Sequence, residues 1–506
     1  MITHQIAQNE YFEQLLTQEH RNELPLYYTF CELLENCKKK FADCPAISDM
    51  VNTVNYGELY DRIAHRRAFL NEEGYTKGDI IAVMAPNCLA AMELYMAIPT
   101  AGYTVIMLPA AENALNEEQL GRIIKKFDIK GMFVHSSLEE LTKNQPVKLY
   151  SLDATSENVA EMAEVSPEDT AVICFSVNND AGNPYGAMLS HKAIMRAAHN
   201  GLFIPGHPYN QRTIAILPLS HVFGAIRGLL TCIYTGALVF ACEDMSNIVF
   251  DIPKMKPTIL TLVPGLAETV LALAKIKGAD FLQGIETIIC GGAYVQPKLI
   301  KLADSFGITL FAGYGMTEAT GMISANVDNL TKPETIGKVY CGNEVRIVDG
   351  EIQVKGDTVM KGYYNDPERT KEVFTEDGWL KTGDLGEFDE EGYLHILGLR
   401  KNLIVLPNGE NVSPEELEKF FIVLPEVADC VVKEGDLRGR PLIAIEVLPN
   451  MECYKDMEAA AIEADIKAKI KARSGELPSY KGVSKTIVSF EALDHTITDR
   501  LFKIEW

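Results

Sequence analysis

The chain has 506 residues, enough for two or more domains with a large core. Its 47% hydrophobic and 23% charged residues are typical of an ordinary globular protein. The formal net charge of −23 argues against a nucleic-acid partner, because a phosphate backbone binds to a basic surface.

Cysteine spacing and the apolar segments indicate the compartment. The eleven cysteines are scattered, with no C-x-x-C pair, so we expect reduced thiols and no zinc site. The first ten residues are polar and lack the apolar core of a signal peptide. The uncharged stretch at residues 228–242 is shorter than the roughly 20 apolar residues that span a bilayer. The sequence therefore predicts a cytoplasmic protein without a membrane span.

Strand-like and helix-like segments alternate in the first half of the chain. Strands are predicted at residues 79–84, 103–108, 170–175, 213–217, 237–241, 258–263 and 285–289. Helices are predicted at residues 56–73, 87–101, 116–127 and 190–199, with Asn87 and Ser190 as N-caps. This alternation is typical of a mainly parallel sheet covered by helices.

The pattern changes between residues 334 and 395. Glycine and charged residues become frequent and the strands are short, at 344–348 and 351–355, which indicates an antiparallel or barrel-like part. A smaller unit of mixed strands and helices follows. Its strands are predicted at 402–406, 427–433 and 442–447, and its helices at 413–423 and 455–473. We therefore expect an α/β fold: parallel α/β subdomains, a small barrel-like part, then a small α+β unit.

The motif that carries most chemistry is Phe311-Ala-Gly-Tyr-Gly-Met-Thr-Glu318, which follows an apolar strand-like run. Its two glycines let the backbone turn tightly and approach a ligand. Tyr314 can stack on a planar ring. Thr317 can donate to a phosphate oxygen, and Glu318 can bind a hard cation such as Mg²⁺. Taken alone, the same residues are equally compatible with a tight turn that ends in a solvated glutamate.

Two further motifs favour the functional interpretation, Cys290-Gly-Gly-Ala293 after an apolar run and Lys381-Thr-Gly-Asp384. Together the three motifs resemble those of the adenylate-forming superfamily, which includes acyl-CoA synthetases, adenylation domains and luciferases. The resemblance covers nearly the whole chain. It implies an N-terminal AMP-binding domain, residues 1–397, and a mobile C-terminal domain, residues 398–506.

The resemblance implies a role for each motif. The Gly-Gly-Ala segment and Tyr314 would sandwich the adenine, Thr317 would contact the α-phosphate and Glu318 would bind Mg²⁺. Asp384 would accept hydrogen bonds from both ribose hydroxyls. The implied nucleotide-binding set is Gly291, Gly292, Ala293, Tyr314, Gly315, Met316, Thr317, Asp384 and Arg400.

The segment Pro218-Leu-Ser-His-Val-Phe-Gly224 resembles the part of the family that lines the acyl pocket. The resemblance implies that His221 and Gly313 face the acyl substrate. A single histidine is also common as a purely structural residue, so that alternative stays open.

The phosphate loop departs from the family pattern, approximately Thr-Ser-Gly-Thr-Thr-Gly-x-Pro-Lys-Gly. The aligned stretch is Val177-Asn-Asn-Asp-Ala-Gly-Asn-Pro-Tyr-Gly186, whose loop residues are Asn178, Asn179, Asp180, Gly182 and Tyr185. The asparagines tolerate a left-handed backbone, so the turn itself could persist. A carboxylate about 4 Å from one phosphate charge costs on the order of 4 kcal/mol at an effective dielectric of 20. Recruitment of an extra Mg²⁺ by Asp180 would offset that cost.

Two C-terminal motifs also differ. In Thr496-Ile-Thr-Asp-Arg500, Arg500 stands where the family has its adenylation lysine, and Lys503 lies nearby. Arginine keeps the charge but not the geometry. In the hinge motif Gly398-Leu-Arg-Lys401, leucine replaces the arginine that contacts ribose; Arg400 could replace it after a one-residue slip, and Lys401 fits the hinge position. Each change alone is compatible with drift within the family.

The retained residues would hold AMP, whereas the altered ones would handle pyrophosphate. We therefore expect AMP or an acyl adenylate to bind and ATP to bind weakly. The leading prediction is an enzyme, a carboxylate ligase that makes an acyl-AMP from ATP and an acid, fatty acids included. It would pass the acyl group to CoA or to the phosphopantetheine thiol of an acyl carrier protein. The predicted catalytic residues are Thr317, Glu318, Lys401 and Arg500.

The alternative is a catalytically impaired relative that binds AMP, an acyl adenylate or an acyl ligand as a partner or regulatory protein. The changes at Asp180, Tyr185, Leu399 and Arg500 favour this second interpretation.

Overall fold

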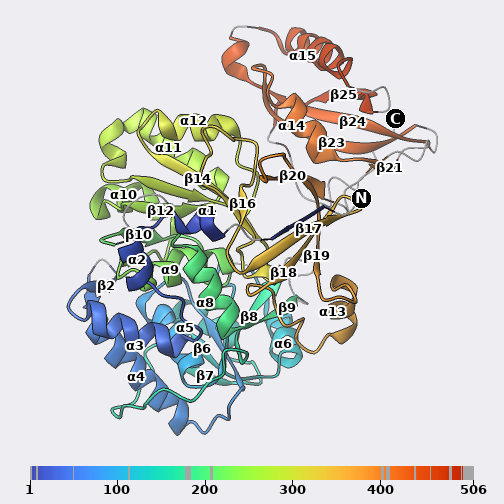
Figure 1. Ribbon diagram of the computed structural model, residues 1–506. Helices are drawn as coiled ribbons and strands as arrows, with labels where there is room; N and C mark the ends of the chain where they lie inside the picture. Colours follow the sequence, from blue (N-terminus) through green and yellow to red (C-terminus); the bar gives the residue numbers. More distant parts are fainter. Residues whose placement is uncertain are drawn as a thin grey trace.

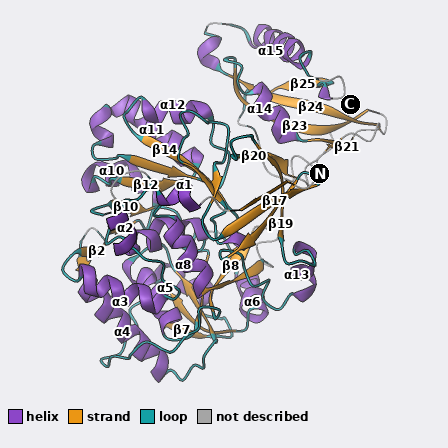
Figure 2. Cartoon of the chain, viewed as in Figure 1, coloured by secondary structure: helices purple, strands orange, loops and turns teal. Residues whose placement is uncertain are grey.

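Parallel sheets covered on both sides by helices make up the larger part of the fold, as Figures 1 and 2 show. The computed structural model describes residues 3–6, 9–49, 51–111, 114–176, 184–204, 209–399, 404–405, 411–437, 440–455, 457–477, 481–491 and 493. Among these residues no helix is long and apolar enough to cross a bilayer. The predicted α/β fold class is confirmed.

A six-stranded sheet has the order β7-β6-β4-β5-β8-β9 and is parallel except for its last strand. Its strands are β4 (Ile80–Met84), β5 (Thr104–Leu108), β6 (Ile129–Val134), β7 (Lys148–Ser151), β8 (Thr170–Ser176) and β9 (Tyr185–Ser190). Strands β4 and β5 are buried along their whole length, because helices cover both faces of the sheet. The helices of this half include α3 (Phe30–Phe41), α4 (Tyr56–Glu72), α5 (Leu89–Thr100), α6 (Glu117–Lys126), α7 (Glu139–Thr142) and α8 (His191–Asn200).

The two predicted helix caps have different outcomes. Ser190 caps α8, because its side chain accepts a hydrogen bond from the Ala193 amide, as predicted. The prediction for Asn87 is wrong, since Cys88 occupies the N-cap of α5. The Asn87 amide instead donates to the carbonyl oxygens of Ala215 and Leu217, at 2.7 and 2.8 Å. A buried amide that can satisfy its donors on the neighbouring sheet does so in preference to capping a helix.

Two further sheets complete the central part of the chain. The first has the order β10-β11-β2-β3, with β2 (Pro45–Ser48), β3 (Thr53–Asn55), β10 (Arg212–Ala215) and β11 (Leu238–Ala241). The second has the order β12-β13-β14-β15-β16, with β12 (Ile259–Leu262), β13 (Thr287–Cys290), β14 (Thr309–Tyr314), β15 (Ser324–Asn326) and β16 (Lys338–Val339). Associated helices are α1 (Asn9–Glu13), α2 (Gln18–Glu23), η2 (Phe223–Leu230), α9 (Thr231–Tyr234), α10 (Ile248–Met255), α11 (Pro264–Lys277) and α12 (Pro297–Asp304). Strands β12, β13 and β14 are parallel, so the segments that follow β13 and β14 lie at the same edge of the sheet.

The predicted change to short antiparallel strands is confirmed. A five-stranded antiparallel sheet joins β1 (Thr3–Ile6), β17 (Asn343–Val348), β18 (Glu351–Gly356), β19 (Leu380–Phe388) and β20 (Leu394–Leu399). Strand β1 pairs with β17 although more than 300 residues separate them, and Figure 1 shows the N-terminal strand lying beside it. Helix α13 (Pro367–Val373) lies between β18 and β19 in the chain.

The last part of the chain has a core of its own. Its elements are β21 (Ile404–Val405), β22 (Asn411–Val412), α14 (Pro414–Phe421), β23 (Val427–Leu437), β24 (Arg440–Pro449), α15 (Ala459–Ser474) and β25 (Lys485–Val488). Leu417 and Phe421 of α14 pack with Ile445 of β24 and Ile466 of α15 in one buried cluster. The boundary between residues 397 and 398 stays a prediction.

A buried histidine, His191, and a partly buried one, His199, should make the fold sensitive to acid. Burial lowers the pKa of His191 and of His199 to about 4. The unfolded chain therefore binds more protons between pH 6.5 and 4, and the free energy of unfolding falls as the pH drops through this window. We expect a loss of about 1.4 kcal/mol per histidine and pH unit, to be measured by urea unfolding at pH 7.5 and 5.5. His191→Gln should remove about half of this dependence, and equal stability at both pH values would contradict the account.

Candidate active site

A cavity of about 550 Å³ lies where β13 and β14 end. Six residues predicted from the sequence line it, Gly292, Ala293, Gly313, Tyr314, Gly315 and Asp384. They lie at or just after the ends of β13 and β14, two parallel strands of one sheet, and in β19 of the antiparallel sheet. The register places Cys290 beside Ala312, which brings the Gly-Gly-Ala turn next to Tyr314. The volume of the cavity suits a nucleoside-sized ligand.

The glycines of this edge allow the backbone segments to pack closely. A Cβ atom on Gly315 would lie 2.1 Å from the carbonyl oxygen of Gly321, well inside van der Waals contact. Gly292 has a φ of +82°, a conformation that side chains rarely adopt. The close backbone approach expected from the Phe311–Glu318 motif is therefore present at Gly315.

Gly315→Ala should consequently impair nucleotide binding. The added methyl group must push apart two backbone segments of the cavity wall, and a displacement of about 1 Å is enough to disrupt binding contacts. We expect the Kd for AMP to rise at least about tenfold, measured by isothermal calorimetry. Gly265→Ala in α11 is the matched control, because a Cβ there meets no atom within 4 Å. Unchanged AMP binding by Gly315→Ala would show that this turn does not border the ligand.

A hydrogen bond joins the two polar residues expected to hold the nucleoside. The Tyr314 hydroxyl donates to Oδ2 of Asp384 at 2.5 Å. Burial, with the charge of Asp384, raises the pKa of Tyr314 well above 10, so the phenol remains a donor. The turn before Asp384 is held by the Gly383 amide, which donates to Glu351 Oε1 at 3.2 Å. This arrangement fixes the carboxylate at the edge of the cavity.

Glu318 is buried and held by two hydroxyl groups. Glu318 is only 4% exposed. Its Oε1 atom accepts hydrogen bonds from Ser176 Oγ and from the Tyr363 hydroxyl, the latter at 2.6 Å. Burial, followed by the charge of Glu318, raises the pKa of Tyr363. The following Thr320 has a left-handed backbone with a φ of 50° and donates from Oγ1 to Thr358 O. The structure thus keeps one orientation of a buried carboxylate.

The donor set around Glu318 fits Mg²⁺ only if the substrate supplies most of the ligands. Among the described residues there is no group of three or more carboxylate, histidine or cysteine side chains that could hold a metal ion. A single carboxylate with phosphate oxygens and water is nevertheless a normal coordination for Mg²⁺. Met316 and Thr317 connect Glu318 to the cavity along the chain, and Thr317 begins the short helix η5 (Thr317–Ala319).

The predicted acyl-pocket residues lie near this edge, but their role stays a prediction. His221 is exposed and precedes η2 by two residues. Phe223, the first residue of η2, packs against Gly291, since a Cβ on that glycine would lie 3.2 Å from the ring. Gly313 lines the cavity described above.

Seven predicted site residues lie outside the described residues: Asn178, Asn179, Asp180, Gly182, Arg400, Lys401 and Arg500. Tyr185 is described and begins β9, where it pairs with Ser176 of β8.

The sequence did not reveal several residues of the site. Ser176 and Tyr363 hold Glu318, and Tyr294, Glu415 and Lys419 line the cavity. Lys419 of α14 donates to the Ile396 carbonyl at 2.5 Å and lies 4.7 Å from the centre of the Tyr294 ring. Burial lowers the pKa of Lys419. Only Tyr294 had a signal in the sequence, because it directly follows the Gly-Gly-Ala motif.

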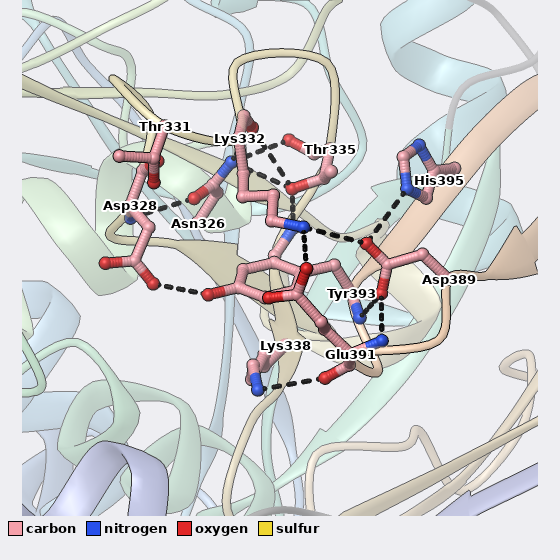
Figure 3. A network of polar contacts seen from close by, with 11 residues as sticks. Asn326, Asp328, Thr331, Lys332, Thr335, Lys338, Asp389, Glu391, Tyr393 and His395 are labelled. Atoms are coloured by element: carbon pink, nitrogen blue, oxygen red, sulfur yellow. Dashed lines mark hydrogen bonds and ion pairs between the residues drawn. The ribbon is translucent and has the colours of Figure 1, made fainter.

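A polar network fixes the wall formed by residues 333–336, as Figure 3 shows. The Asn326 amide donates to the carbonyl oxygens of Lys332 and Thr335, at 2.7 and 3.1 Å. The Lys332 ammonium forms ion pairs with Asp389 and Glu391 in the turn between β19 and β20. The network therefore ties the cavity wall to the hairpin that carries Asp384.

Comparison with known proteins supports the resemblance to AMP-binding enzymes that the sequence motifs indicate. A model of the AMP-binding enzyme family matches residues 34–364. Oxalate–CoA ligase of Arabidopsis thaliana is 28% identical over 442 residues, 80% of this chain and 85% of that protein. 4-Coumarate–CoA ligase 1 of Solanum tuberosum is also 28% identical, over 81% of each chain.

Solved structures show the same fold. The anthranilate–CoA ligase AuaEII in complex with anthranoyl-AMP has a TM-score of 0.80 at 20% identity, covering 93% of this chain and 95% of that one. ATP-bound MatB from Rhodopseudomonas palustris has a TM-score of 0.79 at 23% identity, with coverages of 92% and 96%.

The relatives are acid–thiol ligases, which confirms the predicted class of enzyme, and ATP or AMP and CoA are the ligands of that class. They lend no support to the alternative of a regulatory binding protein. The family model matches well over half of this chain. The chain therefore belongs to the family of AMP-binding enzymes, the adenylate-forming superfamily that its motifs resemble.

Proposed function

We propose that this protein activates a carboxylic acid as an acyl adenylate and transfers the acyl group to CoA. One observation carries the proposal: Tyr314, Asp384 and the Gly-Gly-Ala turn meet in one cavity, and the buried Glu318 follows four residues after Tyr314. This arrangement offers a stacking surface, a diol acceptor and a cation ligand in the order in which adenine, ribose and phosphate occur in ATP.

The chain's own residues would act as follows. Tyr314 and Ala293 hold the adenine. Asp384 accepts hydrogen bonds from the ribose hydroxyls once these replace the Tyr314 hydroxyl as its donor. The Thr317 hydroxyl donates to the α-phosphate, and Glu318 Oε1 or Oε2 binds the cation. A bound Mg²⁺ supplies positive charge that stabilises the phosphate oxygens.

The reaction has two balanced steps. In the first, the substrate carboxylate attacks the α-phosphorus, a bond from the acyl oxygen to phosphorus forms, and the bond to pyrophosphate breaks. In the second, a thiolate attacks the acyl carbonyl carbon and AMP leaves. Arg500 is our proposed source of positive charge in the first step.

CoA is the acceptor we favour because the relatives named above are CoA ligases. Transfer to an acyl carrier protein and a cytoplasmic location remain predictions from the sequence. The acid is a small-molecule carboxylate whose identity a substrate panel must establish.

The proposal is tested by thioester formation. The purified protein is incubated with ATP, Mg²⁺, CoA and each of a panel of acids that includes oxalate, 4-coumarate and fatty acids. We expect AMP and one acyl-CoA in equal amounts, detected by mass spectrometry, and neither product without an acid. Silence with every acid, from a protein that still binds AMP, would contradict the proposal and favour the regulatory alternative.

A further inference from the structure

Tyr185 stands where the family pattern has a lysine, so this chain lacks a positive charge at a position close to the buried Glu318 carboxylate. Ser176 and Tyr185 form a cross-strand pair where β8 ends and β9 begins, and Ser176 contacts Glu318. The Tyr185 ring lies 5.5 Å from the ring of Tyr363, whose hydroxyl donates to the same carboxylate. Tyr185 therefore borders the region into which phosphates beyond the α-phosphate would extend from Glu318.

Two basic side chains approach the Tyr185 ring. The guanidinium carbon of Arg369, in α13, lies 4.9 Å from the ring centre, and Nζ of Lys126, at the end of α6, lies 5.6 Å from it. These residues come from helices more than 240 positions apart in the sequence. The structure thus brings two positive charges to a site where the sequence alone indicates that one has been lost.

Arg369 is the more specific of the two. Its Nη1 donates to Glu372 at 2.6 Å, whereas its buried Nε has no hydrogen-bond partner among the described residues. The unpaired Nε–H leaves Arg369 with donor capacity that an incoming acceptor could use. A guanidinium also offers parallel donors that match phosphate oxygens, and it stacks on an aromatic ring.

We infer that Arg369, supported on the Tyr185 ring, binds the β- or γ-phosphate of ATP in place of the lysine that the phosphate loop lacks. The inference rests on the proposed function, because it assumes that ATP enters the cavity with its ribose at Asp384. Lys126 adds positive charge to the same region. The carboxylate of Glu372 competes for Arg369, so removal of that charge should release the guanidinium rather than weaken ATP binding.

Binding measurements on the whole protein test the inference without any acid or turnover. The Kd values for ATP and AMP are measured by isothermal calorimetry at one Mg²⁺ concentration. Arg369→Gln should raise the Kd for ATP about tenfold to a hundredfold, the usual range for a hydrogen bond to a charged group, and leave that for AMP unchanged. Glu372→Gln breaks the same ion pair but keeps the arginine, so it should leave the ATP affinity unchanged or higher.

A rescue variant separates phosphate binding from a structural role. Tyr185→Lys in the Arg369→Gln background should restore most of the lost ATP affinity, because the new lysine would supply the positive charge that position 369 no longer gives to the phosphate. Equal losses for ATP and AMP, a loss of ATP affinity in Glu372→Gln, or no effect of Arg369→Gln would each overturn the inference. So would failure of the unmodified protein to bind ATP. A protein that shows the expected pattern but makes no acyl adenylate would contradict the proposed function alone.

Discussion

Glu318→Gln should lower the rate of acyl-adenylate formation by about 10²- to 10³-fold, the usual loss when one group that stabilises transition-state charge is removed. The substitution keeps the volume of the side chain and its position between Ser176 and Tyr363. It removes the negative charge that would hold Mg²⁺ against the phosphates. The rate is measured in a single turnover with saturating ATP and acid.

Tyr363→Phe is the matched control for Glu318. It removes one of the two hydroxyl donors to the carboxylate and keeps the aromatic ring beside Tyr185. We expect a loss of about tenfold, smaller than that of Glu318→Gln, because the carboxylate keeps its charge and Ser176 still donates to it. Binding of AMP should be unchanged in both variants. Adenylation by Glu318→Gln at the rate of the unmodified protein would exclude the proposed role of this carboxylate.

Asp384→Asn should raise the Kd for AMP by about 10²-fold. The carboxylate can accept from both ribose hydroxyls, whereas an amide offers one acceptor oxygen and presents donors to the other hydroxyl. Each hydrogen bond to a charged group contributes about 1.5 to 3 kcal/mol, so the loss of one accounts for most of the effect. Calorimetric titration with AMP measures it directly.

Tyr314→Phe distinguishes the ribose contact from the integrity of the cavity. The variant keeps the stacking ring and removes the hydroxyl that donates to Asp384. Since the carboxylate oxygen then needs no exchange of partners, the Kd for AMP should stay within about threefold of that of the unmodified protein. A loss equal to that of Asp384→Asn would mean that the Tyr314–Asp384 hydrogen bond is required to shape the site.

Local motifs allowed much of the lining of this cavity to be predicted. The Gly-Gly-Ala turn follows β13 and Tyr314 ends β14, and the parallel pairing of the two strands brings these ends together. The strand-to-loop pattern is therefore visible in short windows of sequence. Asp384 was predicted because Lys381-Thr-Gly-Asp384 resembles a motif of the family.

Contacts made over long chain separations could not be predicted. Ser176 reaches Glu318 across 142 residues, and Tyr363 reaches it across 45. Lys419 lines the cavity from a helix of the last part of the chain. None of these side chains differs in type or spacing from an ordinary buried or surface residue. The cap assigned to Asn87 failed for the same reason, since its partners lie on another sheet.

The altered phosphate loop predicts a weak affinity for ATP, and this stays a prediction. Tyr185 and Asp180 argue for weak binding on charge alone. Arg369 and Lys126, which the fold brings to the Tyr185 ring, supply positive charge that the sequence pattern does not reveal. The balance between these charges decides whether the enzyme starts from ATP at ordinary concentrations.

The most direct measurement of the central claim is acid-dependent exchange of pyrophosphate into ATP, with fatty, aromatic and dicarboxylic acids at several Mg²⁺ concentrations. We predict exchange above the acid-free background with at least one acid, abolished in Glu318→Gln. Absence of exchange with every acid, from protein that binds AMP normally, would contradict the account of an enzyme that forms an acyl adenylate from ATP.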